Sequence, residues 1–396
     1  IPFFTFQGHL MNHLDWGDLT PETFLKEYWQ KKPLLIKGGF KNFIDPLTPE
    51  ELAGFSMEEE IESRIIAKGE DHMWSVEHGP FESFDDYGDK DWTLLVQATN
   101  NWSSETHDLL KPFRFMPNWR LDDVMVSFST PNGGVGPHLD RYDVFIIQGQ
   151  GKRHWRVGLP DDSLETLVPH EDLKQVSDFD AVIDVITESG DILYIPPNHP
   201  HDGIAVDNAL NYSIGFQAPS SQELISTFAD LMIDRDIGNS RYGDPKRKPT
   251  DKPEELTHSD IVSLQNFMVE AIKDRKLFNN FIGGYLTHNH HTLEIIEPEE
   301  QLSHQAFESL IASGDIIIKP VLGIKALYNC DNASLFVNGN KFVLGGDCVD
   351  LAKKIAQGRP LTAFDLESSL DSLNNVNLLT TLINMGYWYI DQSDEL

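Results

Sequence analysis

Between about residues 90 and 217 the chain is a succession of short apolar runs separated by Gly, Pro, Asn and Asp. The runs include VMVSFS, VFIIQG, HWRVGL, DILYIPP and NYSIGF. Short apolar runs with turn residues between them are typical of the strands of a β-barrel or sandwich. We therefore expect a barrel in this part of the chain, with the turn at residues 148–151 joining two strands as a hairpin.

A glycine-rich stretch, residues 133–136, leads into His138 and Asp140 within this region. If a strand starts here, period-two geometry places the imidazole and the carboxylate on one face, where both could bind one metal. A third ligand is then needed from a neighbouring strand, and the segment after a Pro-Pro pair offers His199 and His201. Two histidines and one carboxylate, with open positions, are typical of non-haem iron(II) oxygenases. His-x-Asp alone is a weak signal in a chain with 15 histidines, but the strand context and the second element together predict a metal site.

The spacing of apolar residues lengthens to three and four between about residues 220 and 286, which predicts amphipathic helices. One apolar stripe contains Leu224, Phe228, Leu231 and Met232, and a second contains Ile261, Leu264, Phe267 and Met268. Residues 238–253, rich in Gly, Pro and charged residues, are expected to form the loop between them. The stripes could pack on the barrel of the same subunit or on a second subunit, and the sequence leaves both possibilities open.

The last part of the chain is expected to contain helices and a β-hairpin, as a winged-helix module does. We expect a helix at 305–312, a strand at 316–318, a hairpin turn at Asn338-Gly339, and helices near 348–357, 362–373 and 376–385. Asn-Gly between apolar runs is a strong hairpin signal. Residues 301–396 contain six Lys and Arg against eleven Asp and Glu. This balance favours a protein-binding or structural module that makes no direct contact with nucleic acid.

Bulk properties restrict the class of protein. A length of 396 residues predicts two or three compact units. The formal net charge of -32 argues against binding of phosphate backbones and would attract a basic partner. No apolar run approaches the roughly 20 residues of a membrane helix, so no membrane span is expected. Two cysteines, Cys330 and Cys348, cannot form a disulfide framework, which favours a cytoplasmic protein.

The barrel region resembles the JmjC-type ribosomal oxygenases. The resemblance rests on GGVGPHLDRYDVFIIQGQGKRHWRVG, GDILYIPPNHPHDG and NYSIGFQAP, and it extends from about Trp29 through the tail. It implies an α+β protein with a double-stranded β-helix (cupin/JmjC) barrel, a helical dimerisation segment and a winged-helix-like C-terminal domain. The expected boundaries are residues 11–219 for the catalytic domain, 220–290 for the helical segment and 291–396 for the C-terminal domain.

For the metal, the resemblance implies that His138, Asp140 and His201 bind Fe(II), although His199 stands where the family often has an apolar residue. For the co-substrate 2-oxoglutarate, it places the arginine that binds the distal carboxylate at Arg153.

The resemblance places the serine partner of this arginine at Ser129. Lys152 and Arg156 are the alternative cations and are expected to face solvent. Asn211 and Ser213 share a face of the last strand and could support the co-substrate or the metal ligands.

The function implied is hydroxylation of an arginine side chain at its β-carbon in a basic protein of the large ribosomal subunit. The reaction would consume O2 and convert 2-oxoglutarate to succinate and carbon dioxide in a homodimeric enzyme. Two alternatives stay open: the same chemistry on histidine or methyl-lysine of another protein, and a non-enzymatic, metal-binding cupin that binds partners.

One further cluster, His288, His290 and His291, could suggest zinc. It has no carboxylate or cysteine at ligand spacing, so we expect a solvated helix end there.

Overall fold

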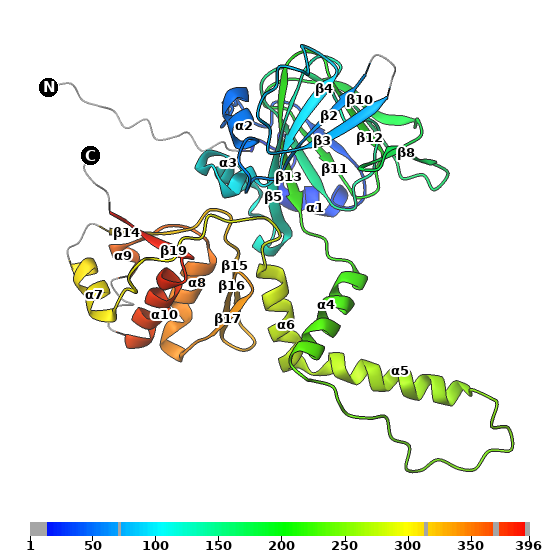
Figure 1. Cartoon of the computed structure of the whole chain (residues 1–396), viewed down its shortest axis with the longest axis vertical. Coiled ribbons are helices and arrows are strands. Elements are labelled where there is room, and N and C mark those ends of the chain that lie inside the picture. Colours follow the sequence, from blue (N-terminus) through cyan, green and yellow to red (C-terminus); the bar gives the residue numbers. More distant parts are fainter. Residues whose placement is uncertain (1–13, 70–72, 313–315, 367–371, 393–396) are drawn as a thin grey trace.

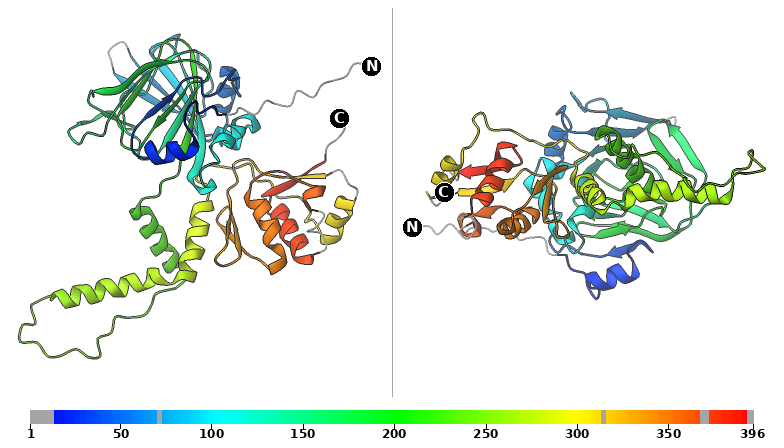
Figure 2. Two further views of the ribbon diagram at one scale, coloured as in Figure 1. Left: turned by 180° about the vertical axis from the view of Figure 1, so that it is seen from behind. Right: turned by 90° about the horizontal axis from the view of Figure 1, so that it is seen from below.

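The computed structural model describes residues 14–69, 73–312, 316–366 and 372–392. It divides into a barrel, three helices that extend below the barrel, and a C-terminal domain beside them (Figure 1). The left view of Figure 2 shows that α5 (His258–Lys273) and the loop before it project away from the two domains. The arrangement expected from the sequence, a barrel followed by helices and a mixed C-terminal domain, is confirmed.

Two sheets form the barrel. One has eight strands in the order β1-β11-β6-β13-β5-β4-β2-β3, and the other has three in the order β10-β7-β12. The strands of the larger sheet are β1 (Leu34–Ile36), β2 (Ser63–Lys68), β3 (Trp74–His78), β4 (Trp92–Val96), β5 (Leu121–Ser129), β6 (Val144–Gln148), β11 (Ile192–Ile195) and β13 (Ala209–Phe216). The smaller sheet contains β7 (Arg153–Gly158), β10 (Ala181–Thr187) and β12 (His201–Ala205), and a separate hairpin pairs β8 (Thr166–His170) with β9 (Leu173–Val176).

The expectation that residues 148–151 close a hairpin is wrong. Strand β6, which precedes the turn, pairs with β11 and β13, whereas β7, which follows it, pairs with β10 and β12. Both edges of β6 are therefore occupied by strands that are distant in sequence, and no edge is left for β7. The turn instead carries the chain from one sheet to the other.

The outer face of the larger sheet is covered by the N-terminal segment. Helix α1 (Pro21–Glu27) begins with a side-chain cap, because the side chain of Thr20 accepts a hydrogen bond from the Thr23 N–H and proline occupies the first turn. Phe24 of this helix is fully buried, and its ring lies 4.8 Å from that of Tyr194 and 5.3 Å from that of Phe145. Helices α2 (Pro49–Phe55) and α3 (Ser104–Asp108) complete this layer. Aromatic packing here holds β6 and β11 from outside the barrel.

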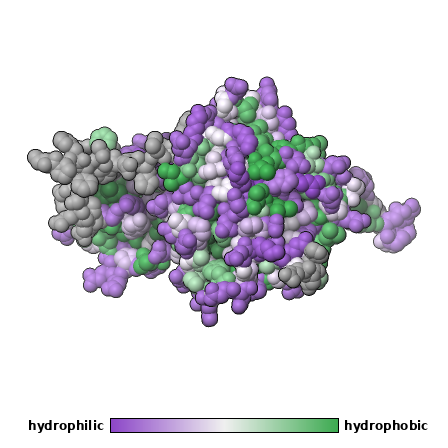
Figure 3. Space-filling model, turned by 90° about the horizontal axis from the view of Figure 1, so that it is seen from above, coloured by the Kyte–Doolittle hydropathy of each residue, from purple (hydrophilic) through white to green (hydrophobic). Residues whose placement is uncertain are grey.

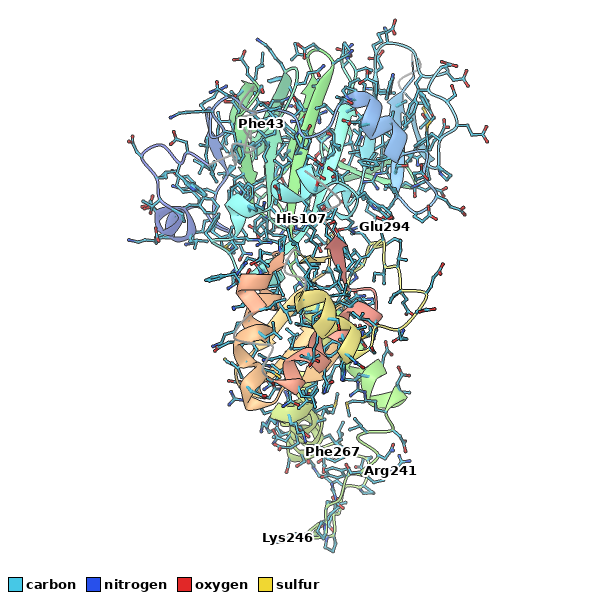
Figure 4. The ribbon with its side chains drawn as sticks, turned by 90° about the vertical axis from the view of Figure 1, so that its left-hand side faces the viewer. Phe43, His107, Arg241, Lys246, Phe267 and Glu294 are labelled. Carbon is cyan, nitrogen blue, oxygen red and sulfur yellow. The ribbon has the colours of Figure 1, made fainter. Side chains whose placement is uncertain are left out.

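The helical region contains three helices rather than the expected two. Helices α4 (Ser221–Asp234) and α5 correspond to the two apolar stripes, and α6 (Arg275–Thr287) follows α5 after the single residue Asp274. Phe228 of α4 is buried against α6, with its ring 5.1 Å from that of Phe281. Helix α5 contains no buried residue. Figure 4 accordingly places Phe267 of α5, with Lys246 of the preceding loop, at the end of the molecule far from Phe43 in the barrel.

The C-terminal domain has its own core, in which Trp388, Phe307 and Leu335 are almost fully buried. Its elements are α7 (His304–Ala312), β14 (Ile316–Pro320), β15 (Ala326–Asn329), β16 (Ser334–Val337), β17 (Asn340–Val343), α8 (Val349–Ala356), β18 (Leu361–Thr362), α9 (Ala363–Leu366), α10 (Leu373–Asn384) and β19 (Trp388–Gln392).

The predicted Asn338-Gly339 turn is confirmed. Val337 pairs with Asn340, and both turn residues have positive φ, as a two-residue hairpin turn requires. The helix expected at 362–373 corresponds to α9 for its first residues, and the part at 367–371 lies outside the described residues.

Among the residues that the structure describes, no helix is both long and apolar enough to cross a membrane. Seen from above, the surface of the barrel mixes hydrophilic and hydrophobic residues (Figure 3). The two cysteines, Cys330 and Cys348, are both free.

Candidate functional site

His138, Asp140 and His201 come together at one end of the barrel interior. One candidate ligand atom from each side chain lies within 4.8 Å of the other two. Among the described residues, these three side chains form the group that could hold a metal ion. His201 is the first residue of β12. His138 is expected to lie at the start of a strand, but it forms an isolated bridge with His201 instead. In this bridge each backbone N–H donates to the carbonyl oxygen of the other residue over 3.0 Å. This bridge, rather than strand alternation, brings the two imidazoles together.

The backbone also orients both imidazole rings. Nδ1 of His138 lies 2.9 Å from the carbonyl oxygen of Gly136, and Nδ1 of His201 lies 2.9 Å from that of His199. Because a carbonyl oxygen can only accept, Nδ1 of each ring carries the hydrogen and Nε2 keeps its lone pair. Nε2 of His201 lies 3.5 Å from Oδ2 of Asp140, and Nε2 of His138 lies 4.0 Å from Oδ1. The lone pairs therefore converge on the carboxylate.

His138 and Asp140 favour the ionisation states that bind metals, whereas the contact with Asp140 outweighs burial and raises the pKa of His201. Burial, assisted by the nearby charge of His201, lowers the pKa of His138 to about 4. Burial alone would raise the pKa of Asp140, but the adjacent imidazoles of His201 and His138 lower it to about 2. At neutral pH the site thus offers an ionised carboxylate beside a neutral imidazole, and metals bind to these forms.

His199 lies outside the group. Its side chain is buried, Nδ1 is 3.0 Å from the carbonyl oxygen of Pro197, and Nε2 has no hydrogen-bond partner among the described residues. The geometry therefore favours His201 as the third ligand, and metal binding itself stays a prediction.

The three side chains line a cavity of about 270 Å³ between the two sheets. Its lining residues alternate along the strands, as inward-facing residues of a barrel do. They include Thr93, Leu95 and Gln97 near β4, Asp123, Met125 and Ser127 of β5, Val144 and Ile146 of β6, Arg153 and Trp155 of β7, and Asn211, Ser213 and Gly215 of β13, together with Asp122, Val135, Tyr142 and His291.

Arg153 is a buried cation inside this cavity. Its Nη2 donates to Oγ of Ser129, and that oxygen lies 2.8 Å from Oγ1 of Thr93. Its Nε has no partner, and no carboxylate of the described residues forms an ion pair with it. Burial lowers the pKa of Arg153 to about 10, so the group is still charged at neutral pH. A buried guanidinium without a carboxylate partner fits the carboxylate of a bound ligand.

The alternative cations point away from the cavity. Lys152 pairs with Glu188 and Arg156 with Asp178, both on the exposed face. Asn211 is inside, where its Nδ2 donates to Gln148 and its Oδ1 has no partner among the described residues. Ser213 also lines the cavity. The structure thus brings Arg153, Ser129, Asn211 and Ser213 to one interior with the metal triad.

Acidic residues at the other end of the cavity were not expected from the sequence. Asp122 and Asp123 are the second and third residues of β5, and Asp123 shares the strand face of Met125, Ser127 and Ser129. Period-two counting back from Ser129 could have identified Asp123.

The solvated helix end expected for the histidine cluster is wrong for His291. Its side chain is only 27% exposed, and its Nε2 lies 3.8 Å from Oδ2 of Asp123. No local sequence signal points to this contact.

Comparison with known proteins agrees with this geometry. Residues 108–224 match the family described as JmjC domain, and residues 270–389 match the family described as ROXA-like winged helix. The chain is 42% identical to the ribosomal protein uL16 3-hydroxylase of Escherichia coli K12, over 96% of this chain and 98% of the relative. It is 29% identical to a probable ribosomal oxygenase of Haemophilus influenzae, over 81% of each chain.

A solved structure of the E. coli ribosomal oxygenase YcfD in complex with cobalt and 2-oxoglutarate superimposes with a TM-score of 0.87 and 41% identity, covering 96% of this chain and 99% of that one. Fold, domain types and near full-length identity all agree, and the chain belongs to the JmjC family of ribosomal oxygenases.

Proposed function

We propose that the chain is an Fe(II)- and 2-oxoglutarate-dependent hydroxylase that oxidises the β-carbon of an arginine side chain in ribosomal protein uL16. The observation that carries this proposal is the buried guanidinium of Arg153, which forms no ion pair with the described residues, in the same cavity as the His138, Asp140 and His201 triad. The E. coli relative is named as a uL16 3-hydroxylase, and the third carbon of an amino acid is its β-carbon.

The residues present fit the metal and the co-substrate. His138, Asp140 and His201 would hold the metal through two Nε2 atoms and one carboxylate, and three ligands leave positions open. Arg153 and Ser129 would bind the distal carboxylate of 2-oxoglutarate, and Asn211 has a free acceptor oxygen within the cavity. Iron, when bound, would supply oxygen activation coupled to decarboxylation of 2-oxoglutarate, which protein side chains cannot perform.

The acidic end of the cavity favours a cationic substrate. The Asp123 carboxylate is largely buried, and no described residue hydrogen-bonds to its Oδ1. Burial raises the pKa of Asp123, with a further contribution from neighbouring Asp122. A guanidinium would stabilise the ionised carboxylate through paired hydrogen bonds, which a methylated ammonium or a neutral imidazole cannot match. We therefore favour arginine over methyl-lysine and histidine.

The test is incubation of purified uL16 with the enzyme, Fe(II), 2-oxoglutarate and oxygen, followed by mass spectrometry of its peptides. A gain of one oxygen atom on an arginine supports the proposal. The same gain on a histidine, or loss of a methyl group from lysine, would support the alternative substrates. Absence of any 2-oxoglutarate turnover would support the non-enzymatic cupin instead.

We further propose that the enzyme is a cytoplasmic homodimer in which the helical segment forms the subunit interface. The proposed domain boundaries are residues 11–219, 220–290 and 291–396. Support for the interface comes from α5, which has no buried residue although it carries an apolar stripe.

A further inference from the structure

The segment that follows α6 runs along the acidic end of the cavity and is anchored on both sides. The Asn101 side chain of the barrel domain donates to the Thr292 carbonyl over 3.1 Å. On the other side, the Asn289 side chain donates to the carbonyl of Gly323 in the C-terminal domain, also over 3.1 Å. His291 lies between these two anchors, and its ring lines the cavity. The position of this ring is therefore set by both domains.

His291 lies between two carboxylates. Its Nε2 is 3.8 Å from Oδ2 of Asp123, and its Nδ1 is 3.6 Å from Oε2 of Glu62. The same Oδ2 of Asp123 accepts the N–H of Ala98 over 3.1 Å. The other oxygen, Oδ1, lies beside Gly215, where a Cβ would approach it to 2.9 Å. Because glycine has no side chain, this oxygen is not covered from that direction.

The two oxygens of Asp123 thus have different surroundings. Oδ2 accepts a hydrogen bond from a backbone N–H and lies 3.8 Å from Nε2 of His291, whereas Oδ1 has no hydrogen-bond partner among the described residues. Since Asp123 and Gly215 both line the cavity, Oδ1 is the oxygen placed to receive a donor from a bound substrate.

The neighbouring carboxylate is already neutralised by the C-terminal domain. Nζ of Lys325 lies 2.7 Å from Oδ1 of Asp122, and the Lys325 side chain is only 13% exposed. Of the two consecutive aspartates, Asp122 is therefore paired across the domain boundary and Asp123 keeps a free oxygen.

We infer that the C-terminal part of the chain completes the substrate cavity. His291 is a positioning residue that orients Asp123 to bind the substrate guanidinium, and Lys325 forms an ion pair with Asp122. This inference rests on the proposed arginine substrate. Asp123 is the binding group, and His291 acts through it.

A pH dependence follows from the charges that face Asp123. Burial and the charge of Asp122 raise the pKa of Asp123, whereas His291 and Lys325 lower it. Glu62 lies on the far side of the His291 ring. Removing His291 therefore raises the pKa of Asp123 further. The ionised carboxylate that binds a guanidinium is then lost at a higher pH, and the acidic limb of the activity profile moves upward.

The experiment uses the peptide of uL16 that contains the modified arginine, and the same peptide with citrulline in its place. Binding is measured on the full-length protein without oxygen, and kcat and KM are measured with oxygen. For His291→Ala we expect the Kd of the arginine peptide to rise about two- to fivefold, the effect of losing one partly exposed ion-pair contact. The citrulline peptide should bind as it does to the wild type, and the KM for 2-oxoglutarate should not change.

His288→Ala is the matched control, because His288 lies in the same segment but is exposed. His291→Gln keeps a polar side chain that cannot be protonated and repeats the test if alanine lowers the melting temperature.

An unchanged Kd in both His291 variants, or an equal loss for the two peptides, would overturn the positioning role. If the wild type hydroxylates no arginine of uL16, the proposed function fails first, and the wild-type reaction run beside the variants reveals this.

Discussion

At the scale of single residues, the backbone determines which nitrogen each metal-binding candidate presents. The carbonyls of Gly136 and His199 hold Nδ1 of His138 and His201, so that both Nε2 atoms face Asp140. Losing one of three protein ligands leaves two, which weakens metal binding at a site with several open positions. The ligand assignment is therefore sharply testable.

We expect His138→Ala and Asp140→Ala each to abolish conversion of 2-oxoglutarate to succinate and to lower the iron content of the reconstituted protein. His201→Ala should behave in the same way. His199→Ala is the control and should retain most activity, because its Nε2 lies outside the group. Loss of activity in His199→Ala with retention in His201→Ala would shift the ligand assignment by two residues.

Arg153 can be separated from the metal ligands by its effect on the co-substrate. We expect Arg153→Met to raise the KM for 2-oxoglutarate about ten- to a hundredfold, since a hydrogen bond to a charged group contributes roughly 1.5–3 kcal/mol. Iron content should stay unchanged. Arg156→Met, on the exposed face of the same strand, is the control and should leave the KM as it is. An unchanged KM in Arg153→Met would move the carboxylate-binding role to another cation.

Much of the candidate site could be predicted from the sequence, because most of its residues belong to local sequence patterns. His138 and Asp140 are two residues apart, Arg153 begins a strand whose alternation is visible in the sequence, and His201 follows a Pro-Pro element. His291 could not be predicted, because its contact with Asp123 exists only after α6 and the next segment fold back against β5. The sequence around a histidine at a helix end does not indicate such a contact.

At the scale of elements, an expectation that depends on local sequence is correct, and one that depends on the pairing of distant strands is wrong. The Asn338-Gly339 hairpin is confirmed because the turn residues themselves adopt positive φ and pair adjacent strands. The hairpin expected at residues 148–151 is wrong because β6 pairs with distant strands on both edges. Turn chemistry specifies a change of direction, whereas strand pairing depends on which edges are free.

The pairing of β7 with β12 also supports the cavity wall. Gly203 of β12 lies opposite Trp155 of β7, and a Cβ at Gly203 would come within 2.6 Å of the indole ring. The indole lines the cavity, with the guanidinium of Arg153 5.7 Å from its ring centre. Any side chain at Gly203 must therefore displace the indole.

We expect Gly203→Ala to lower the free energy of unfolding by about 1–3 kcal/mol, as overpacking of a core does, and to raise the KM for 2-oxoglutarate. Thermal melting and steady-state kinetics measure the two effects. Gly54→Ala in α2 is the control, because nothing lies within 4 Å of a Cβ there, and it should be neutral or stabilising. A Gly203→Ala protein with wild-type stability and KM would show that the indole has room to move.

At the scale of the whole molecule, charge and shape fit a basic protein substrate and a subunit partner. The net charge of -32 would accelerate encounter with a basic ribosomal protein. The helical segment would bind the subunit partner through apolar rather than charged residues, because its apolar residues are exposed where α5 projects from the domains (Figure 1). On α5 the exposed apolar side chains are Ile261, Leu264, Phe267, Met268, Val269 and Ile272.

The structure changes which residues should be used to test dimerisation. Phe228 belongs to the predicted stripe of α4, but it packs against Phe281 of α6 in the same subunit. A charge at Phe228 would therefore disturb the fold of one chain. Leu264 of α5 is 44% exposed, and Met268, one turn further along the same face, is 73% exposed. Charges at these positions change the proposed interface without entering a core.

We expect light scattering on the intact protein to give about twice the chain mass of 44.9 kDa. Large exposed apolar patches are rare in monomers, and a two-fold partner placed against α5 would cover this one on both subunits. Leu264→Glu should lower the measured mass toward that of one chain. Gln265→Glu is the matched control, because it adds the same charge at the adjacent exposed residue of the same helix and should leave the mass unchanged. The dissociated variant should keep the melting temperature of its barrel, since α5 contributes no buried residue to one subunit. A monomeric mass for the wild type at micromolar concentration would contradict the dimer, and an equal loss of mass in both variants would assign the effect to charge rather than to the apolar stripe.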